Sequence, residues 1–107
     1  MTVAEFAEKL NLTPLSLPDP EREITGFYAG DLLSWVMGRA QSGDCWFTIM
    51  SNINVLAVAT LADVACVVLA EGVTLEDKEL ASAKAKGINV FTSQKNTYTL
   101  CAEAGGL

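Results

Sequence analysis

Small and polar residues that could hold a ligand gather in four short segments, each placed where a predicted strand ends and a helix follows. These segments are 28–31, 50–54, 71–74 and 92–96. Backbone N–H groups at a helix start, together with nearby hydroxyl and amide side chains, can bind a phosphate or another small polar group. The candidate ligand-binding residues are Gly30, Asp31, Ser51, Asn52, Asn54, Glu71, Gly72, Thr92 and Ser93. All of them also have ordinary roles as caps and turn formers, so a purely structural role stays open.

The segment 44–63 is the centre of the predicted fold, because it carries no charge between its two terminal aspartates. We interpret it as a buried strand at 45–50, a polar turn at 51–54 and a helix at 55–62. A strand without apolar–polar alternation is typical of a parallel sheet covered on both faces. We expect Asn54 or Ser51 to cap the helix, which is hydrophobic all round and should therefore be covered on every side.

The first part of the chain predicts a helix, an irregular connection and a strand. Thr2 and Glu5 have the spacing of a capping box ahead of an amphipathic helix that should end near Asn11. The segment 13–23 contains three prolines, which predicts an ordered but irregular connection. A strand is expected at 23–28.

A second helix is expected at 32–39, with Asp31 as its cap. It carries tryptophan and methionine among other apolar residues, which favours core packing, with a protein interface as the alternative. The later part of the chain predicts a strand at 65–70, a helix that starts at a Thr74–Asp77 capping box and ends before Gly87, and a final strand and helix at 88–91 and 97–104.

After the first helix, strands and helices alternate four times. This order predicts one α/β domain over residues 1–107, with a small, mostly parallel sheet of four to five strands and helices packed on it. Ligands of such sheets bind beyond the carboxyl ends of the strands, where the four polar segments are expected.

Several kinds of chemistry are excluded or disfavoured by composition. The chain has no histidine, so neither a Ser–His nor a Cys–His nucleophile pair can form, and it has no P-loop or dinucleotide-binding glycine motif. Its carboxylates fall at predicted turns and caps. The three cysteines Cys45, Cys66 and Cys101 are widely spaced, which argues against a disulfide framework or a metal site within one chain and leaves open a meeting of cysteines across a dimer interface. We therefore expect no enzyme activity, no cofactor and a reducing, cytoplasmic location.

Charge and hydropathy also restrict the partners. Thirteen acidic residues face seven basic ones, giving a formal net charge of −6 that repels nucleic acid. No secretory signal pattern is visible at the start of the sequence. The uncharged run 45–62 is interrupted by Ser51, Asn52 and Asn54, so two buried elements explain it better than a membrane span. We expect neither nucleic acid nor membrane as a partner.

The chain resembles the DRTGG domain family over nearly its whole length. The resemblance lies in the run I-T-G-F-Y-A-G-D-L-L-S-W-V-M at 24–37, the run G-D-C-W-F-T-I-M-S-N-I-N-V-L-A-V-A-T-L-A-D at 43–63, V-V-L-A-E-G at 67–72 and T-Y-T-L-C at 97–101. It is strongest for small stand-alone members related to the N-terminal domain of HPr kinase/phosphorylase. The family's signature Asp-Arg-Thr-Gly-Gly would fall near 51–54, where Ser, Asn, Ile and Asn stand and the charged pair is absent.

The resemblance implies a fold related to the N-terminal domain of Mur ligases and a regulatory role. We therefore expect a non-catalytic regulatory or accessory module that forms a homodimer and senses a nucleotide or small phosphorylated ligand. The dimer surface is expected on the helices 32–39 and 55–62. The alternative is an interaction adaptor for a hydrogenase or another electron-transfer complex, without a ligand of its own. Stand-alone members of the family are commonly encoded near such complexes.

Overall fold

A five-stranded sheet in the order β1-β5-β4-β3-β2 forms the centre of the chain. The computed structural model describes all 107 residues. The strands β2, β3, β4 and β5 are parallel, and β1 runs antiparallel to β5 at one edge. A small, mostly parallel α/β sheet is therefore confirmed. The strands are β1 (Thr13–Ser16), β2 (Gly26–Ala29), β3 (Asp44–Thr48), β4 (Cys66–Leu69) and β5 (Val90–Thr92).

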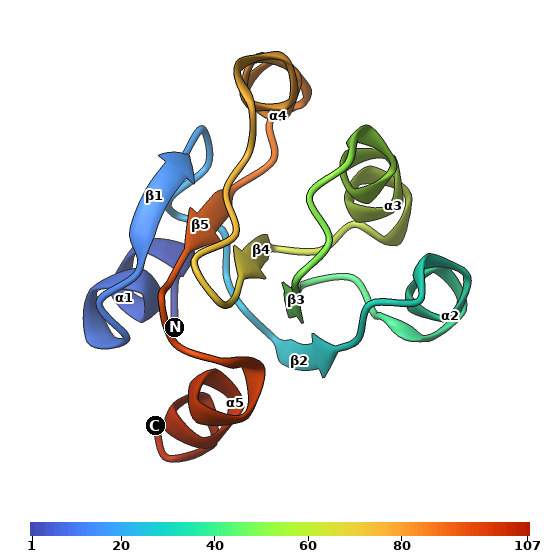
Figure 1. Cartoon of the computed structure of the whole chain (residues 1–107). Helices are drawn as coiled ribbons and strands as arrows, with labels where there is room; N and C mark the ends of the chain where they lie inside the picture. Colours follow the sequence, from blue (N-terminus) through green and yellow to red (C-terminus); the bar gives the residue numbers. More distant parts are fainter.

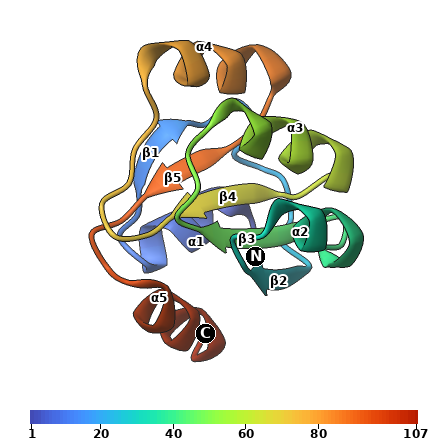
Figure 2. The same cartoon turned by 45° about the vertical axis from the view of Figure 1, so that its right-hand side comes forward.

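Helices cover both faces of the sheet. A row of three, α2, α3 and α4, lies on one face, and α1 and α5 lie on the other (Figures 1 and 2). The three crossovers from β2 to β5 use the same face because successive parallel strands are joined with the same hand. The helices are α1 (Val3–Lys9), α2 (Leu33–Arg39), α3 (Ile53–Ala62), α4 (Asp77–Lys86) and α5 (Thr97–Gly105).

The core is divided by the sheet into two apolar clusters. Along β3, Cys45 and Phe47 belong to the cluster under α1 and α5, and Trp46 belongs to the cluster under α2, α3 and α4. Successive side chains of a strand point to opposite faces, so one strand supplies both layers. Every residue of β3 and β4 is buried. This explains the unbroken apolar runs in the sequence.

The irregular connection expected at 13–23 is wrong for its first residues, which form β1. Its hydrogen bonds to β5 shift register between Pro14 and Ser16. The buried hydroxyl of Ser16 donates to the backbone carbonyl of Ile88 at 2.8 Å and anchors the strand. Proline is tolerated here because β1 is an edge strand, where an N–H directed outward needs no partner in the sheet.

The helix caps match the sequence only in part. The capping box of Thr2 and Glu5 is present, and Gly87 ends α4 with a left-handed φ of 73°. The expected caps of the other helices are wrong: α3 is capped by the side chain of Asn52, and α2 begins without a side-chain cap. The Thr74–Asp77 box does not form, since α4 begins after Glu76 without a side-chain cap.

Within a single copy of the chain, the apolar helix at 55–62 is not covered on every side. In α3, Val55 and Leu56 are buried, whereas Leu61 is 71% exposed and Ile53 at the start of the helix is exposed. Alanines occupy much of the rest of this helix. An apolar sequence therefore does not require complete burial here. No helix in the chain is both long enough and apolar enough to cross a membrane.

Candidate functional site

The four polar loops lie at one end of the sheet. Because β2, β3, β4 and β5 are parallel, the loops that follow them leave the sheet at the same end. All nine candidate ligand-binding residues lie at or beyond these strand ends. Within this end, however, hydrogen bonds join the loops in two separate pairs, described next.

The loops after β2 and β3 are joined by Asp31. Its carboxylate accepts hydrogen bonds from the hydroxyl of Thr48 at 2.8 Å and from the backbone N–H of Ile49 at 3.0 Å. The indole N–H of Trp46 donates to the carbonyl of Gly30 at 2.9 Å. Gly30 and Asp31 are thus occupied by contacts that hold the two loops together. Asp31 fixes a loop, whereas the sequence predicted a helix cap.

The loops after β4 and β5 are joined by backbone contacts. Gly72 N–H donates to the carbonyl of Ser93 at 2.8 Å, and Glu71 N–H donates to that of Lys95 at 2.9 Å. The Thr92 hydroxyl donates to the carbonyl of Val73. These contacts require left-handed backbone at Glu71 and Gly72, with φ of 61° and 73°. This conformation is sterically less favourable for Glu71, which has a Cβ atom, than for glycine.

Gln94 covers part of the place where ligands of such sheets usually bind. Chains leaving β4 and β5 turn to opposite faces, since α4 and α5 lie on opposite sides of the sheet (Figure 1). Ligands of open α/β sheets often bind at such a divergence. Here the side chain of Gln94 covers Gly72 so closely that a Cβ atom on Gly72 would lie 2.7 Å from Oε1 of Gln94.

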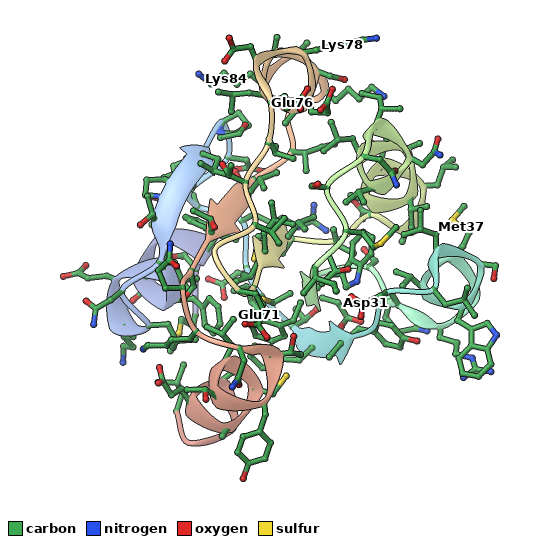
Figure 3. All side chains as sticks on the ribbon, in the orientation of Figure 1. Asp31, Met37, Glu71, Glu76, Lys78 and Lys84 are labelled. Atoms are coloured by element: carbon green, nitrogen blue, oxygen red, sulfur yellow. The ribbon has the colours of Figure 1, made fainter.

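Polar side chains without a hydrogen-bond partner lie around the start of α3 and in the neighbouring loop after β4. The Asn52 side chain caps the helix by accepting from Asn54 N–H at 2.9 Å. The side chains of Ser51, Asn54 and Glu71 make no hydrogen bond within the chain. Figure 3 labels Glu71 and Asp31 on opposite sides of β3. These three side chains, the N–H groups of Asn52 and Ile53 and the free Oδ2 of Asp31 are available to a ligand at this end.

Positive charge is scarce at this end of the sheet. Lys95 follows β5, but its ammonium group is already paired with Glu103 at 2.7 Å. Asp31 and Glu71 add two carboxylates. An anionic ligand would therefore depend on backbone N–H groups and on the positive end of the α3 dipole.

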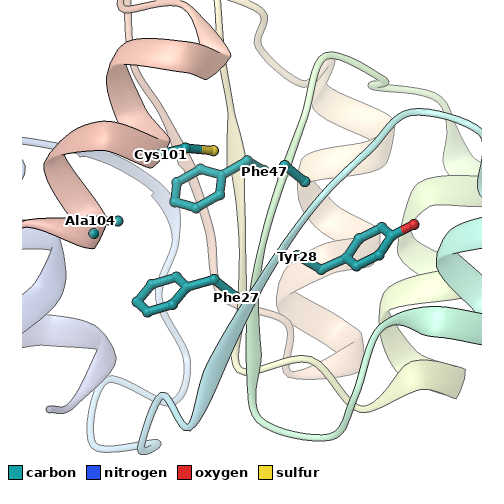
Figure 4. A pocket seen from close by; sticks show the side chains of 7 residues that line it. Phe27, Tyr28, Phe47, Cys101 and Ala104 are labelled. Atoms are coloured by element: carbon teal, nitrogen blue, oxygen red, sulfur yellow. The ribbon is translucent and has the colours of Figure 1, made fainter.

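Two cavities lie on the face of the sheet under α1 and α5, and none of the nine candidate residues lines them, although the larger one reaches Tyr28 and Ala29 of the first polar segment. The larger, of about 290 Å³, lies between β2 and α5 (Figure 4). The second, of about 210 Å³, adjoins it and shares Phe27 and Ala104. Neither cavity was predictable from the sequence, because Phe27 is half-exposed only through the position of β2 at the edge of the sheet. The larger cavity is lined by Phe27, Tyr28, Ala29, Phe47, Cys101, Ala104 and Gly105.

The cysteines lie on the same face of the sheet. Cys45 and Cys66 are buried neighbours across β3 and β4, and Cys101 of α5 lines the larger cavity. Burial raises the pKa of the Cys45 thiol well above its usual value and also raises that of Cys101. Both thiols therefore stay protonated and weakly nucleophilic near neutral pH. No group of three His, Cys, Asp or Glu side chains is placed to hold a metal ion.

Comparison with known proteins gives a structural likeness only. No protein-family model matches the sequence, and no curated protein matches it either. The fold is similar to a crystal structure of the CBS and DRTGG domains from the regulatory region of a Clostridium perfringens pyrophosphatase, in complex with the activator diadenosine tetraphosphate. The TM-score is 0.67 at 13% identity, over 94% of this chain and 44% of that one. This likeness supports a DRTGG-like fold and gives no link to HPr kinase.

Proposed function

We propose that this chain is a non-catalytic regulatory module of the cytoplasm that binds a nucleotide or small phosphorylated ligand beyond the carboxyl ends of its strands and works as a homodimer. The observation that carries this proposal is the fold likeness over 94% of the chain to a regulatory region crystallised with a nucleotide activator. The sequence resemblance to DRTGG domains points the same way. The chain spans less than half of that regulatory region, so only part of such a region is compared.

The start of α3 is the best place for the ligand. Ser51 and Asn54 offer a free hydroxyl and a free amide there, and Glu71 on the neighbouring loop can accept from a ribose hydroxyl or a base amine. The N–H groups of Asn54 and Val55 at the start of α3 are bound by the side chain and the carbonyl of Asn52, which leaves the N–H groups of Asn52 and Ile53 for a ligand. They favour a negatively charged group. This arrangement suits a ligand that is partly anionic and partly polar, such as a nucleotide.

A non-catalytic role is supported by what the side chains can do. The cysteine thiols whose pKa values are raised lie in or beside the core, away from the polar loops. Asp31 uses Oδ1 to hold the loops after β2 and β3 together through Thr48 and Ile49, which gives this carboxylate a structural role. With no histidine in the chain, the usual general base near neutral pH is absent.

The test is thermal melting of the protein against a panel of nucleotides that includes diadenosine tetraphosphate. A ligand at a hundredfold excess over its dissociation constant stabilises the folded state by about 2.7 kcal/mol. Replacing Asn52 with Ala would be ambiguous, because loss of the α3 cap alone costs about 0.5–2 kcal/mol. Asn52→Asp keeps a capping side chain and adds negative charge, so it should weaken an anionic ligand without unfolding the helix.

Asn96→Asp is the matched control, since Asn96 caps α5 in the same way through Thr99 N–H. The proposal predicts a melting shift with one nucleotide class, reduced by Asn52→Asp and retained in Asn96→Asp. Equal loss in both variants would place the ligand elsewhere. No shift with any nucleotide or phosphorylated metabolite would contradict the ligand-sensing role.

The second candidate function is an adaptor for a hydrogenase or other electron-transfer complex, without its own ligand. Two observations favour it: none of the nine candidate ligand-binding residues lines a cavity, and large apolar side chains are exposed at the start of α2 and on α2 and α3, namely Leu32, Trp35 and Leu61. Sedimentation of mixtures with purified hydrogenase subunits tests this function. Co-sedimentation that is lost in Trp35→Glu, in a protein that shows no ligand-dependent melting shift, would favour the adaptor.

A further inference from the structure

The two edges of the sheet differ in how they prevent pairing with another strand. At β1, Pro14 and the register shift before Ser16 interrupt the edge. At β2, pairing with β3 runs without interruption from Gly26 to Ala29, and the strand contains neither proline nor charge. Natural proteins guard exposed edges with proline, charge or a bulge, because unpaired N–H and C=O groups attract other strands. The β2 edge has none of these guards.

The backbone of β2 offers hydrogen bonds directed away from the sheet. Gly30 N–H donates inward to the carbonyl of Phe47 at 3.1 Å. Successive backbone groups of a strand alternate between its two edges, so those of Phe27 and Ala29 face away from β3. Two residues of this kind, separated by one, are what an antiparallel partner strand needs to exchange N–H···O bonds.

Apolar surface flanks the open edge on the face of α1 and α5. Phe27 is 50% exposed although its ring packs against Phe6 and Phe47, with centroids 5.7 and 6.3 Å away. Ala29, two residues on, is exposed and lines the larger cavity (Figure 4). A strand paired with β2 would therefore have an apolar side chain and a cavity beside it.

The other face of the edge carries α2, which ends the row of helices as β2 ends the sheet (Figure 1). Leu32 and Trp35 are 58% and 53% exposed, and the Arg39 guanidinium lies 3.8 Å from the Trp35 ring centroid. Met37 extends from α2 on the side of α3 (Figure 3). Trp35 stands two residues before Met37, which places its side chain on roughly the opposite flank of α2, away from α3 and toward the open edge. Leu32 and Arg39, three residues before and four residues after Trp35, lie next to it on the same flank.

Charge does not oppose contact between two identical surfaces here. Between residues 24 and 38 the only charged residue is Asp31, and its carboxylate is bound to Thr48 and Ile49. All but one unit of the net charge of −6 is therefore carried elsewhere on the chain. Two copies can approach along β2 and α2 without bringing their carboxylates together.

We propose that a second copy of this chain binds at β2 in antiparallel fashion, joining the two sheets into one, with the two α2 helices facing each other across the two-fold axis. This inference rests on the homodimer of the proposed function and specifies its surface. A two-fold axis at Tyr28 lets Phe27 and Ala29 of each copy exchange hydrogen bonds with Ala29 and Phe27 of the other. The assembly closes at two copies, because the guarded β1 edges are the only edges left.

The size of the surface explains why α2 must take part. A stable interface buries roughly 800 Å² per partner, about one-seventh of the 5447 Å² that this chain exposes. A four-residue strand is too short to supply that area, so the exposed faces of α2 and Phe27 have to contribute. The axis at β2 leaves α3 outside the interface, because α3 lies inward of α2 in the helix row (Figure 2).

The experiment is sedimentation equilibrium of the whole chain over a range of concentrations, for the wild type and two exposed helix variants. Trp35→Glu lies on α2 inside the proposed interface, and Leu61→Glu is the matched control on α3. Circular dichroism and melting confirm that each variant folds, and Leu32→Glu replaces Trp35→Glu if that variant does not fold. We expect a wild-type dimer, a dissociation constant raised at least about tenfold by Trp35→Glu, and no change with Leu61→Glu.

A monomeric wild type at all concentrations, or a dimer disrupted by Leu61→Glu and not by Trp35→Glu, would overturn the inference. A dimer unaffected by either variant would overturn it as well. None of these results affects the nucleotide melting test. A protein with a nucleotide-dependent melting shift but no β2 dimer would retain the ligand function and lose this interface alone.

Discussion

The two edges of the sheet are built from opposite kinds of sequence. β1 contains a proline, follows an irregular register and is anchored by the buried hydroxyl of Ser16. β2 is regular, uncharged and next to an apolar cavity. The comparison shows that this fold leaves one edge closed within a single copy and the other open. An open apolar edge is an aggregation risk in a monomer, so it indicates a partner.

The largest expected effect is a difference in unfolding free energy between alanine variants of two phenylalanines, one near each edge. Phe91 on β5, the neighbour of β1, is fully buried, whereas Phe27 on β2 is half-exposed. Phe91→Ala should cost about 3–5 kcal/mol of unfolding free energy because it leaves a cavity in the core. Phe27→Ala should cost clearly less in the monomer, since half of the ring is already in water. Urea unfolding at low protein concentration measures both, and equal costs would mean that Phe27 is a core residue.

The next largest effect is expected when proline, which interrupts the β1 edge, is introduced into the β2 edge. Ala29→Pro removes an N–H that faces away from β3, so the bonds between β2 and β3 should survive while pairing with a second copy is blocked. We expect the dimer to weaken by about 1.4 kcal/mol or more, that is tenfold or more. Light scattering at fixed concentration measures this. A dimer that tolerates proline at this position would place its contact elsewhere than on the strand edge.

A smaller effect tests the anchor of β1. Ser16→Ala removes the hydrogen bond to the carbonyl of Ile88 and leaves that buried acceptor unpaired. The expected loss is about 1–2 kcal/mol in chemical denaturation, with the dimer unchanged. Weaker dimerisation together with the lost stability would show that the two edges are coupled through the sheet.

The smallest expected effect on stability concerns the ion pair of Arg22 and Asp63, which belongs to neither edge strand. The Ser42 hydroxyl and the Arg22 guanidinium lower the pKa of Asp63 below its usual value of 3.8. A lowered pKa in the folded state gives stability that is present above the unfolded pKa and is lost as pH falls through the folded one. The pair is largely exposed, so the change is at most about 1 kcal/mol.

Asp63→Asn should remove this part of the pH dependence of unfolding below about pH 4 while tolerating the left-handed φ of 57° at that position. The lowered pKa of Glu5 in its capping box acts in both proteins, so their difference isolates Asp63. An unchanged pH profile would show that the ion pair contributes nothing measurable to stability. Sedimentation of the variant should match the wild type.

The sequence was sufficient for the strand–helix order from residue 23 onward, because β3 and β4 are apolar throughout and are bounded by turns. It was insufficient for β1, where three prolines resembled a loop and only pairing with β5 creates a strand. The caps were misassigned where several capping residues stand close together. Ser51, Asn52 and Asn54 could each start α3, and only the backbone geometry selects Asn52.

The position of the four polar loops was predictable, but the contacts that their side chains make were not. Parallel strands place all four loops at one end, as expected from the order of elements. Whether a polar side chain there is free depends on contacts between loops distant in sequence, such as Asp31 with Thr48 and Gln94 over Gly72. No local pattern encodes these contacts. The cavities escaped prediction for the same reason, since α5 and β2 meet only in the folded chain.

Amide hydrogen exchange of the wild-type protein at low and high concentration is the most direct test of the difference between the two edges. It measures whether only the β2 edge pairs with a second copy. The outward N–H groups of Phe27 and Ala29 should gain protection as concentration rises, because a second copy accepts their hydrogen bonds. The amides of β1 should exchange at the same rate throughout. Concentration-dependent protection at β1, or none at Phe27 and Ala29 while a dimer forms, would contradict the account.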